Sequence, residues 1–212
     1  MRKLVLYSAQ EIPEDRKVDL ELMRLIAKPN PKIAWIPSFF VNNSAWFQNK
    51  VKYYAQYGAI LEEPVQFAAI LLESELQNLF SYDAIHLSGG DTSSFLELLR
   101  KHNLIPRIQD FVARGGVLIG QSAGSIIMTP NIFTAYDCGD ERPLEPFDHT
   151  ALGLVDFAFM PHFEPDLEQP CRKLALELNR TLYACQDGDG IVVNGDEVKF
   201  IGDVLEFKPQ PR

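Results

Sequence analysis

The feature that most constrains this fold is a repeated alternation between short apolar runs and segments of helical periodicity. The apolar run at residues 3–8 precedes residues 18–26, where apolar side chains recur at the spacing of one helix face. The order returns four more times, with these pairs of segments: 32–37 and 44–57, 59–67 and 73–80, 84–87 and 92–100, and 116–120 before a helix that begins at Ala123. Apolar strands separated by helices are typical of a parallel sheet covered on both faces. We therefore predict an α/β fold, a three-layer sandwich with a mostly parallel central sheet.

The second half of the chain does not continue this alternation of strands and helices. Residues 129–150 are rich in Pro, Asp, Asn and Gly, which predicts a surface excursion rather than a packed element. The segments expected after it are a strand over 154–160, a helix over 166–178, and a C-terminal β-hairpin whose strands, 191–193 and 198–201, flank Asn194-Gly195. No linker or repeat divides the chain, so we expect a single domain over residues 1–212.

The length and composition of the chain indicate whether it needs disulfide bonds, metal ions or other cofactors to be stable. A chain of 212 residues, 46% of them hydrophobic, can bury roughly 70% of the surface that its unfolded form exposes. Cys138, Cys171 and Cys185 are odd in number and lack CxxC spacing, which indicates a reducing compartment. No HExxH motif or Cys/His cluster is present. We therefore expect no metal and no other cofactor.

Charge and hydropathy exclude two classes of partner. The formal net charge is −9, and no run of Lys or Arg resembles the footprint of a nucleic-acid binder. The apolar stretch near the N-terminus is too short for a signal peptide and runs into charged residues. No apolar run approaches the roughly 20 residues that a spanning helix needs. We expect a cytoplasmic protein that binds neither nucleic acid nor membrane.

The strongest chemical signal is Gly120-Gln121-Ser122-Ala123-Gly124, a G-x-S-x-G pentapeptide between an apolar strand and a helix. At such a sharp turn a serine hydroxyl projects above the sheet, and small flanking residues let strand and helix approach closely. The Ala123 N–H would then point toward an oxyanion formed at the serine. The alternative is that these residues merely end a strand and cap a helix. The context favours Ser122 as a nucleophile.

A serine nucleophile needs a base, and four histidines are available. His86 lies within an apolar run, His102 follows a charged helix end, and His149 sits in the polar excursion, so structural roles explain all three. His162 comes directly after a predicted strand, where open parallel sheets place their ligands. We therefore predict His162 as the general base.

An imidazole base usually has a carboxylate on its second nitrogen. The candidates are Asp137, which gives the chain order Ser–Asp–His, Glu164, two residues after the histidine, and Asp187, after a short strand. Sequence spacing does not rank these three acids.

A second glycine motif, Ser88-Gly89-Gly90-Asp91-Thr92, also lies between a strand and a helix. It lacks the lysine of a P-loop and the third glycine of a dinucleotide fingerprint. If its strand neighbours that of Ser122, the Gly90 and Ala123 N–H groups would converge as two oxyanion donors. The alternative is a glycine turn with a helix cap.

Together these motifs resemble the peptidase E (aspartyl dipeptidase) and cyanophycinase group of serine peptidases, whose sheet is similar to that of class I glutamine amidotransferases and flavodoxin-like. The motifs are the Gly-Gly-(Asn/Asp)-Thr turn at 89–92, the elbow at 120–124, and Pro161-His162-Phe163. The resemblance covers nearly the whole chain. It implies Ser122 as nucleophile, His162 as general base, and the Gly89-Gly90 turn with Ala123 as the oxyanion hole.

The resemblance also implies candidates for the orienting acid. Asp187, in Gln186-Asp187-Gly188, resembles the acid of a Pro-Glu-Gly segment in that family, and Asp137 corresponds to the other acid proposed there. Glu164 is similar in position to the His-x-Glu acid of amidotransferases. We favour Asp187, with Asp137 next.

Substrate preference is where the chain departs from the family pattern. In the dipeptidases a longer loop after the histidine leads to an arginine that binds the substrate's N-terminal aspartate. Here the corresponding segment, residues 164–169, is short and acidic, and Arg172 is the nearest match to that arginine. The expectation is a monomeric or homodimeric serine peptidase, an exopeptidase or dipeptidase acting on short peptides, with Asp specificity left open. The competing readings are an α/β-hydrolase-type esterase and a non-catalytic binding or chaperone-like protein.

Overall fold

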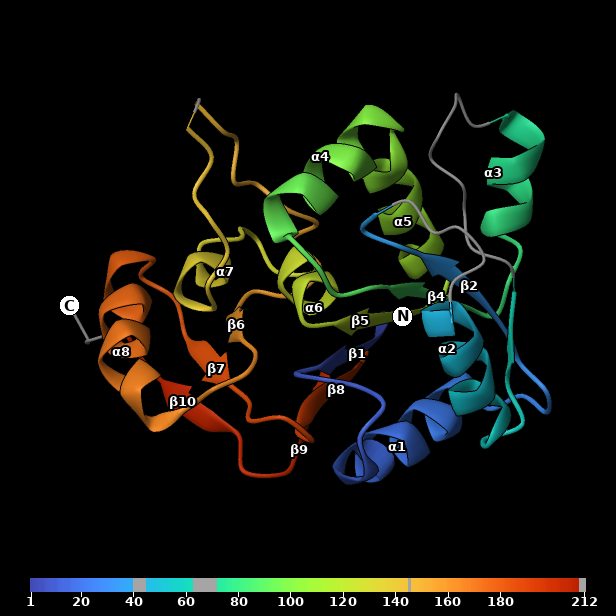
Figure 1. The fold of residues 1–212 in the computed structure, drawn as a ribbon, viewed down its shortest axis with the longest axis horizontal. Helices are drawn as coiled ribbons and strands as arrows, with labels where there is room; N and C mark the ends of the chain where they lie inside the picture. Colours follow the sequence, from blue (N-terminus) through green and yellow to red (C-terminus); the bar gives the residue numbers. More distant parts are fainter. Residues whose placement is uncertain (40–44, 63–71, 145, 210–212) are drawn as a thin grey trace.

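A computed structural model describes residues 1–39, 45–62, 72–144 and 146–209. Its main sheet has seven strands: β1 (Lys3–Tyr7), β2 (Lys32–Ile36), β3 (Ile60–Leu61), β4 (Ala84–Leu87), β5 (Val117–Gln121), β8 (Gly190–Asn194) and β9 (Glu197–Ile201). Their order is β3-β2-β4-β5-β1-β8-β9 (Figure 1). The five strands β1 to β5 pair in parallel, whereas β8 and β9 add an antiparallel edge. The predicted α/β class and mostly parallel sheet are confirmed.

Helices cover both faces of this sheet (Figure 1). The helices that pack on it are α1 (Arg16–Ile26) and α2 (Ala45–Ala55) on one face, and α3 (Glu73–Leu79), α4 (Thr92–Lys101), α5 (Leu104–Ala113) and α6 (Ala123–Ile127) on the other. Strand side chains alternate between the two cores, because successive residues of a strand point to opposite faces. Leu4 and Leu6 join the α4–α5 core, whereas Val5 and Tyr7 join the α1–α2 core. These are the three predicted layers.

A second, three-stranded sheet lies beside the first in the order β10-β7-β6. Its elements are β6 (Ala158–Met160), β7 (Leu182–Ala184) and β10 (Leu205–Phe207), with the helices η2 (Pro165–Leu167) and α8 (Glu168–Glu177) and a small core of its own. The strand expected over 154–160 is therefore shorter than predicted and does not belong to the main sheet. Ala158 and Met160 of β6 pack in the small core with α8, whereas Phe159 between them points into the α4–α5 core.

Other expectations need correction as well. The excursion over 129–150 contains α7 (Thr134–Asp137), and Ile132 and Ala135 within it are fully buried. The strand expected over 59–67 is seen as β3, and residues 63–67 lie outside the described part. The predicted C-terminal hairpin is confirmed as β8 and β9, but its turn residues are Gly195 and Asp196, because Asn194 still pairs with Glu197. Gly195 has φ +65 there, a conformation that favours glycine. Within the described ranges, no helix is long and apolar enough to cross a bilayer.

Candidate active site

The G-x-S-x-G segment forms a strand–turn–helix elbow at the carboxyl end of β5. Ser122 separates β5 from α6 and has φ 50 and ψ −110, which places it in a sparsely populated backbone region. Such a non-glycine conformation costs on the order of 1–3 kcal/mol and persists where neighbouring contacts enforce it. One of these contacts is the 3.1 Å hydrogen bond from the Ser122 N–H to the Tyr7 carbonyl of β1.

The two outer glycines of the elbow are required by close packing. A Cβ on Gly120 would lie 2.6 Å from the Gly124 carbonyl carbon, within the helix that follows. A Cβ on Gly124 would lie 2.2 Å from the Leu87 carbonyl oxygen of β4. Both distances are far shorter than van der Waals contact, so the motif is needed here for the approach of α6 to two strands.

Ser122, His162 and Asp187 form a continuous hydrogen-bonded chain. The His162 Nε2 atom lies 2.8 Å from Ser122 Oγ, and its Nδ1 atom lies 2.7 Å from Asp187 Oδ1. A carboxylate can only accept a hydrogen bond, so it favours the tautomer with the proton on Nδ1. The Nε2 lone pair is then directed at the serine hydroxyl, the arrangement in which imidazole can take its proton.

Sequence reasoning missed Ser8, which follows β1 and is fully buried. Its hydroxyl accepts the backbone N–H of His162 at 2.7 Å and lies 3.0 Å from both Asp187 Oδ1 and the Cys185 carbonyl. His162 has φ 53, so its backbone also adopts a strained conformation. Ser8 therefore contacts both the histidine and the carboxylate. Its position at the carboxyl end of an apolar strand is the one sequence signal that could have pointed to it.

The Gly89-Gly90 turn lies next to the elbow, as expected for neighbouring strands β4 and β5. A Cβ on Gly89 would lie 3.6 Å from Ser122 Cβ. The Gly89 carbonyl accepts hydrogen bonds from Ser38 Oγ at 2.6 Å and Ser88 Oγ at 2.9 Å, which fixes the peptide whose other side carries the Gly90 N–H. Gly90 has φ +132, and a Cβ there would lie 2.2 Å from Ser38 Oγ.

Two N–H groups are therefore available near Ser122. Among the residues that the structure describes, neither the Gly90 N–H nor the Ala123 N–H has a protein acceptor. Each is fixed by its backbone: Gly90 by the anchored turn, and Ala123 by the elbow. Such groups can donate to a negatively charged oxygen without reorganising.

The remaining predicted site residues lie elsewhere. Asp137 ends α7, and burial raises the pKa of its carboxyl while the Arg142 charge opposes this. Glu164 is the exposed residue before η2. Arg172, on α8, pairs with Glu168 at 2.7 Å and lies over the Phe207 ring. The contacts of His162 thus single out Asp187 among the three acids, and a role of Arg172 in binding substrate stays a prediction.

The other histidines occupy structural settings. His86 is fully buried in β4, and its Nδ1 atom lies 2.9 Å from the Tyr54 hydroxyl. Burial lowers its pKa well below the usual range, and the Lys50 charge adds to this. His149 stacks on Phe133, with ring centroids 4.4 Å apart. These contacts agree with the structural roles expected for both residues.

The described residues include three cysteines, of which Cys138 is partly buried and the other two are buried. The three cysteines are free thiols, and burial raises the pKa of Cys138 and of Cys171 to about 12. A thiol with a raised pKa is a poor nucleophile and a poor metal ligand at neutral pH. Over residues 1–39, 45–62, 72–144 and 146–209, no group of three or more His, Cys, Asp or Glu side chains is arranged to hold a metal ion.

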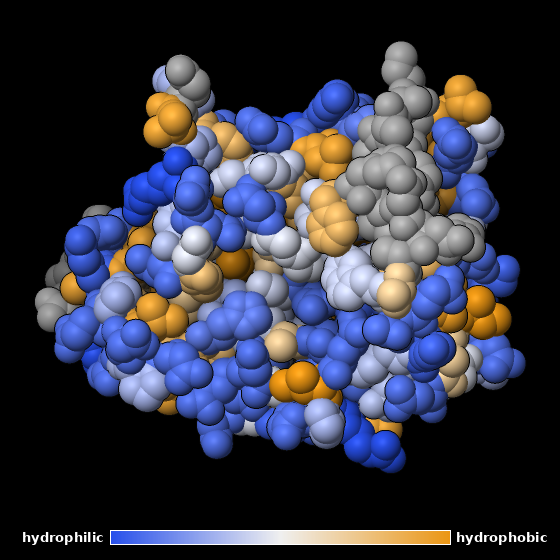
Figure 2. Space-filling view, viewed as in Figure 1, coloured by the Kyte–Doolittle hydropathy of each residue, from blue (hydrophilic) through white to orange (hydrophobic). Residues whose placement is uncertain are grey.

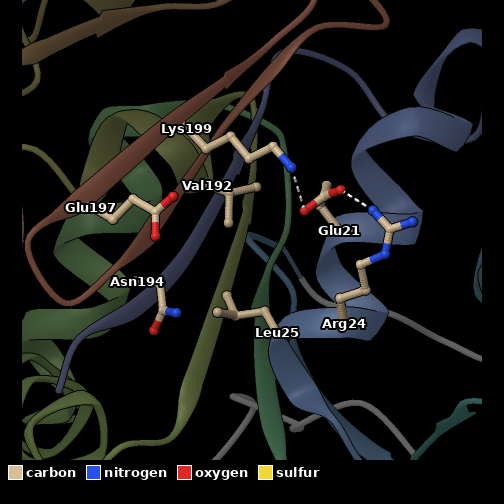
Figure 3. A pocket seen from close by; sticks show the side chains of 7 residues that line it. All are labelled: Glu21, Arg24, Leu25, Val192, Asn194, Glu197 and Lys199. Atoms are coloured by element: carbon tan, nitrogen blue, oxygen red, sulfur yellow. Dashed lines mark hydrogen bonds and ion pairs between the residues drawn. The ribbon is translucent and has the colours of Figure 1, made fainter.

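A separate hollow of about 180 Å³ lies between α1 and the β8–β9 edge of the main sheet (Figure 3). It is lined by side chains of α1, β8 and β9, and Glu21 lies between Arg24 and Lys199 within it. Asn194, in its wall, pairs with Lys3 at the amino end of β1, whereas Ser122 adjoins the carboxyl end. This hollow is therefore distinct from the Ser122 site.

The face of the molecule seen in Figure 2 is largely hydrophilic, with apolar residues scattered over it.

The fold is α/β, and its serine, histidine and carboxylate are arranged as in the serine hydrolase class. The model of peptidase family S51 matches residues 4–201, and the chain belongs to this family.

Individual relatives agree with this family. An uncharacterized peptidase of Pasteurella multocida is 35% identical over 112 residues, which span 52% of this chain and about half, 53%, of the relative. A peptidase E of Nostoc sp. is 27% identical over 195 residues, which span 86% of this chain and 77% of that protein. In fold, the chain is similar to the crystal structure of a peptidase from an acI-B1 actinobacterium, with TM-score 0.73, 20% identity, and coverage of 100% of this chain and 92% of the other.

Proposed function

We propose that the protein is a serine exopeptidase, a dipeptidase on short peptides, and that Ser122, His162 and Asp187 form its catalytic triad. The observation that carries the proposal is the unbroken chain of two hydrogen bonds, 2.8 Å and 2.7 Å long, from the Ser122 hydroxyl through His162 to Asp187. A buried or surface histidine rarely meets a strained elbow serine and a carboxylate together, whereas acyl transfer requires all three.

The reaction then runs through an acyl-enzyme. Ser122 Oγ attacks the peptide carbonyl carbon while its proton passes to His162 Nε2. The Gly90 and Ala123 N–H groups stabilise the oxyanion, and Asp187 stabilises the imidazolium that forms. His162 gives its proton to the departing amine as the C–N bond breaks. Water, deprotonated by His162, hydrolyses the ester and regenerates the serine.

Chain order and contacts favour a peptidase triad over the two competing readings. In an α/β-hydrolase esterase the acid precedes the histidine, whereas Asp187 follows His162. A protein that had lost turnover would not need the strained conformation of Ser122, the strained backbone of His162 and the anchored Gly89-Gly90 turn at once. All of these features are retained here.

The test is covalent labelling combined with peptide hydrolysis. A fluorophosphonate probe should label the wild-type protein, and Ser122→Ala should abolish both labelling and dipeptide hydrolysis. Asp187→Asn should lower kcat by about 10⁴-fold, as expected when the histidine loses its orienting acid, whereas Asp137→Asn should change it less than twofold. Labelling that survives in Ser122→Ala, or a larger loss in Asp137→Asn, would contradict the proposal. A dipeptide library with acidic and neutral first residues ranks the preferred substrates.

The assembly and location of the protein stay predictions. A monomer or homodimer in the cytoplasm, acting on small peptides, is consistent with the proposed reaction. Sedimentation of the purified chain measures whether it is a monomer or a homodimer.

A further inference from the structure

A buried lysine lies beneath the proposed active site. Lys50, on α2, has a side chain with no solvent exposure. Its ammonium group makes three contacts: Gln10 Oε1 at 3.0 Å, Gln121 Oε1 at 2.9 Å and Glu11 Oε1 at 2.5 Å. A buried charge is costly unless it is paired and hydrogen-bonded, and three contacts use all of its donors. Lys50 therefore binds the residue before Ser122 and the loop after β1 together.

This contact decides which way the Gln121 amide points. A lysine ammonium can only donate, so the atom that faces Lys50 is the carbonyl oxygen and the NH₂ group faces away. A Cβ on Gly89 would lie 4.0 Å from Gln121 Cδ, so the amide is next to the Gly89-Gly90 turn. Gln121 is partly exposed, and its NH₂ group has no acceptor within the described part of the chain. The site therefore presents an N–H donor beside the proposed oxyanion hole.

Glu11 presents the opposite charge. It lies between β1 and the short helix η1 (Pro13–Asp15), with φ 83, a strained conformation for a residue with a side chain. One carboxylate oxygen contacts Lys50, and the side chain remains 24% exposed. Glu11 therefore has one oxygen held by a buried cation, while the other has no partner among the described residues.

Glu11 is linked to the residue before Ser122 through Lys50, whereas His162 contacts Ser122 directly. The Ser122 N–H binds the Tyr7 carbonyl, so the loop that starts at Ser8 leaves the sheet beside the nucleophile. Ser8 turns toward His162, whereas Lys50, which holds Glu11, belongs to the α1–α2 layer. His162 must protonate the leaving amine, so the leaving group lies on its side. The acyl half of the peptide then lies toward Gln121 and Glu11.

We propose that Glu11 is a specificity-determining residue that binds the α-ammonium group of the peptide's N-terminal residue, with Lys50 as the positioning residue for Glu11 and Gln121. The substrate class is short peptides with a free amino terminus. The carboxylate then bridges two cations, the Lys50 ammonium and the α-ammonium group of the substrate. The inference rests on the proposed peptidase function, because it needs an acyl side to the site.

The experiment compares two substrates in three proteins. The substrates are the best dipeptide of the library and its N-acetylated form, and the proteins are wild type, Glu11→Gln and Glu14→Gln. Glu14 is an exposed acid three residues further along the chain, in η1, and serves as the matched control. We expect Glu11→Gln to lower kcat/KM for the free dipeptide at least tenfold through KM, and to change kcat/KM for the acetylated form less than twofold. Glu14→Gln should leave both substrates unchanged.

A pH series separates recognition from a structural effect. Peptide α-ammonium groups lose their proton near pH 8. The wild-type KM for the free dipeptide should therefore rise above that pH, and the KM of Glu11→Gln should not. The proposal is overturned if Glu11→Gln lowers kcat/KM equally for both substrates, so that the ratio of kcat/KM between the free and the acetylated dipeptide stays at its wild-type value.

Failure of the proposed peptidase function gives a different result. If wild type hydrolyses neither substrate and no probe labels Ser122, the peptidase proposal fails. Calorimetric titration of Ser122→Ala and of Ser122→Ala/Glu11→Gln with the free dipeptide still tests Glu11. A tenfold loss of affinity in the double variant supports ammonium binding, and equal affinity, or no binding to either protein, overturns it.

Discussion

Replacing Ser8 with alanine tests whether the base and the acid are positioned by the strand next to the nucleophile. Ser8 has no solvent exposure, and its Oγ atom lies 2.7 Å from the His162 backbone nitrogen and 3.0 Å from Asp187 Oδ1. A hydroxyl has one proton, and donation to the charged carboxylate is stronger than donation to the Cys185 carbonyl at the same distance. Ser8→Ala therefore removes an acceptor from the backbone of His162 and a donor from Asp187.

The size of the effect follows from the charges involved. A hydrogen bond to a charged group contributes about 1.5–3 kcal/mol. This support matters most when His162 becomes an imidazolium that faces Asp187, so the loss falls on the transition state. The corresponding decrease in kcat is roughly 10- to 150-fold. KM should change less than threefold, because Ser8 is buried and does not contact substrate.

The assay measures kcat, KM and the free energy of unfolding for Ser8→Ala and for a matched control, Ser125→Ala. Ser125 is also fully buried at this edge of the sheet, and its hydroxyl donates to the Tyr7 carbonyl at 2.8 Å. Both variants lose a buried hydroxyl, so urea titrations should give similar losses of stability. Ser125→Ala should keep kcat within twofold of wild type. If Ser8→Ala also keeps its kcat, or if both variants lose kcat equally, the positioning argument is refuted.

Two further predictions concern packing and buried charge. Gly124→Ala places a Cβ 2.2 Å from the Leu87 carbonyl oxygen, so we expect a loss of about 3 kcal/mol or more in the free energy of unfolding, measured by urea titration; a loss below 1 kcal/mol would show that α6 can shift. Asp15 has a buried Oδ1 atom with no partner among the described residues, and burial raises its pKa from 3.8 to about 7. The folded protein therefore keeps a proton that the unfolded chain releases, and stability falls as pH rises from about 4 to about 7. Asp15→Asn should remove this fall. The free energy of unfolding of the variant minus that of wild type should therefore be roughly 2–4 kcal/mol larger at pH 8 than at pH 4; parallel pH–stability curves for the two proteins would contradict it.

Features with local causes were predictable from the sequence. The elbow glycines are set by contacts within a few residues and with one neighbouring strand, so the pentapeptide indicated the turn. The parallel strands were predictable because burial on both faces requires continuous apolar runs. Helix α5 was not predicted: Pro106 interrupts its pattern, but it occupies the first turn, where a missing N–H costs nothing.

Features with non-local causes were not predictable in the same way. The choice among Asp137, Glu164 and Asp187 depends on which carboxylate the fold brings to His162 Nδ1, and chain spacing does not contain that information. Ser8 had no motif, because its contacts are with residues 154 and 179 positions away. The separate sheet of β6, β7 and β10 also escaped prediction, since a short apolar strand does not reveal which sheet it joins.

The division into two sheets affects how the proposed triad can move. His162 and Asp187 follow β6 and β7, two paired strands of the small sheet, and the Phe163 N–H to Cys185 carbonyl bond of 2.9 Å continues that pairing. Ser122 belongs to the large sheet, where its backbone is bound to β1. The histidine–carboxylate distance is thus set within one sheet, whereas the serine–histidine distance is set between two. A shift between the sheets would change the second distance and spare the first, and Ser8, which follows β1 and binds His162, opposes such a shift.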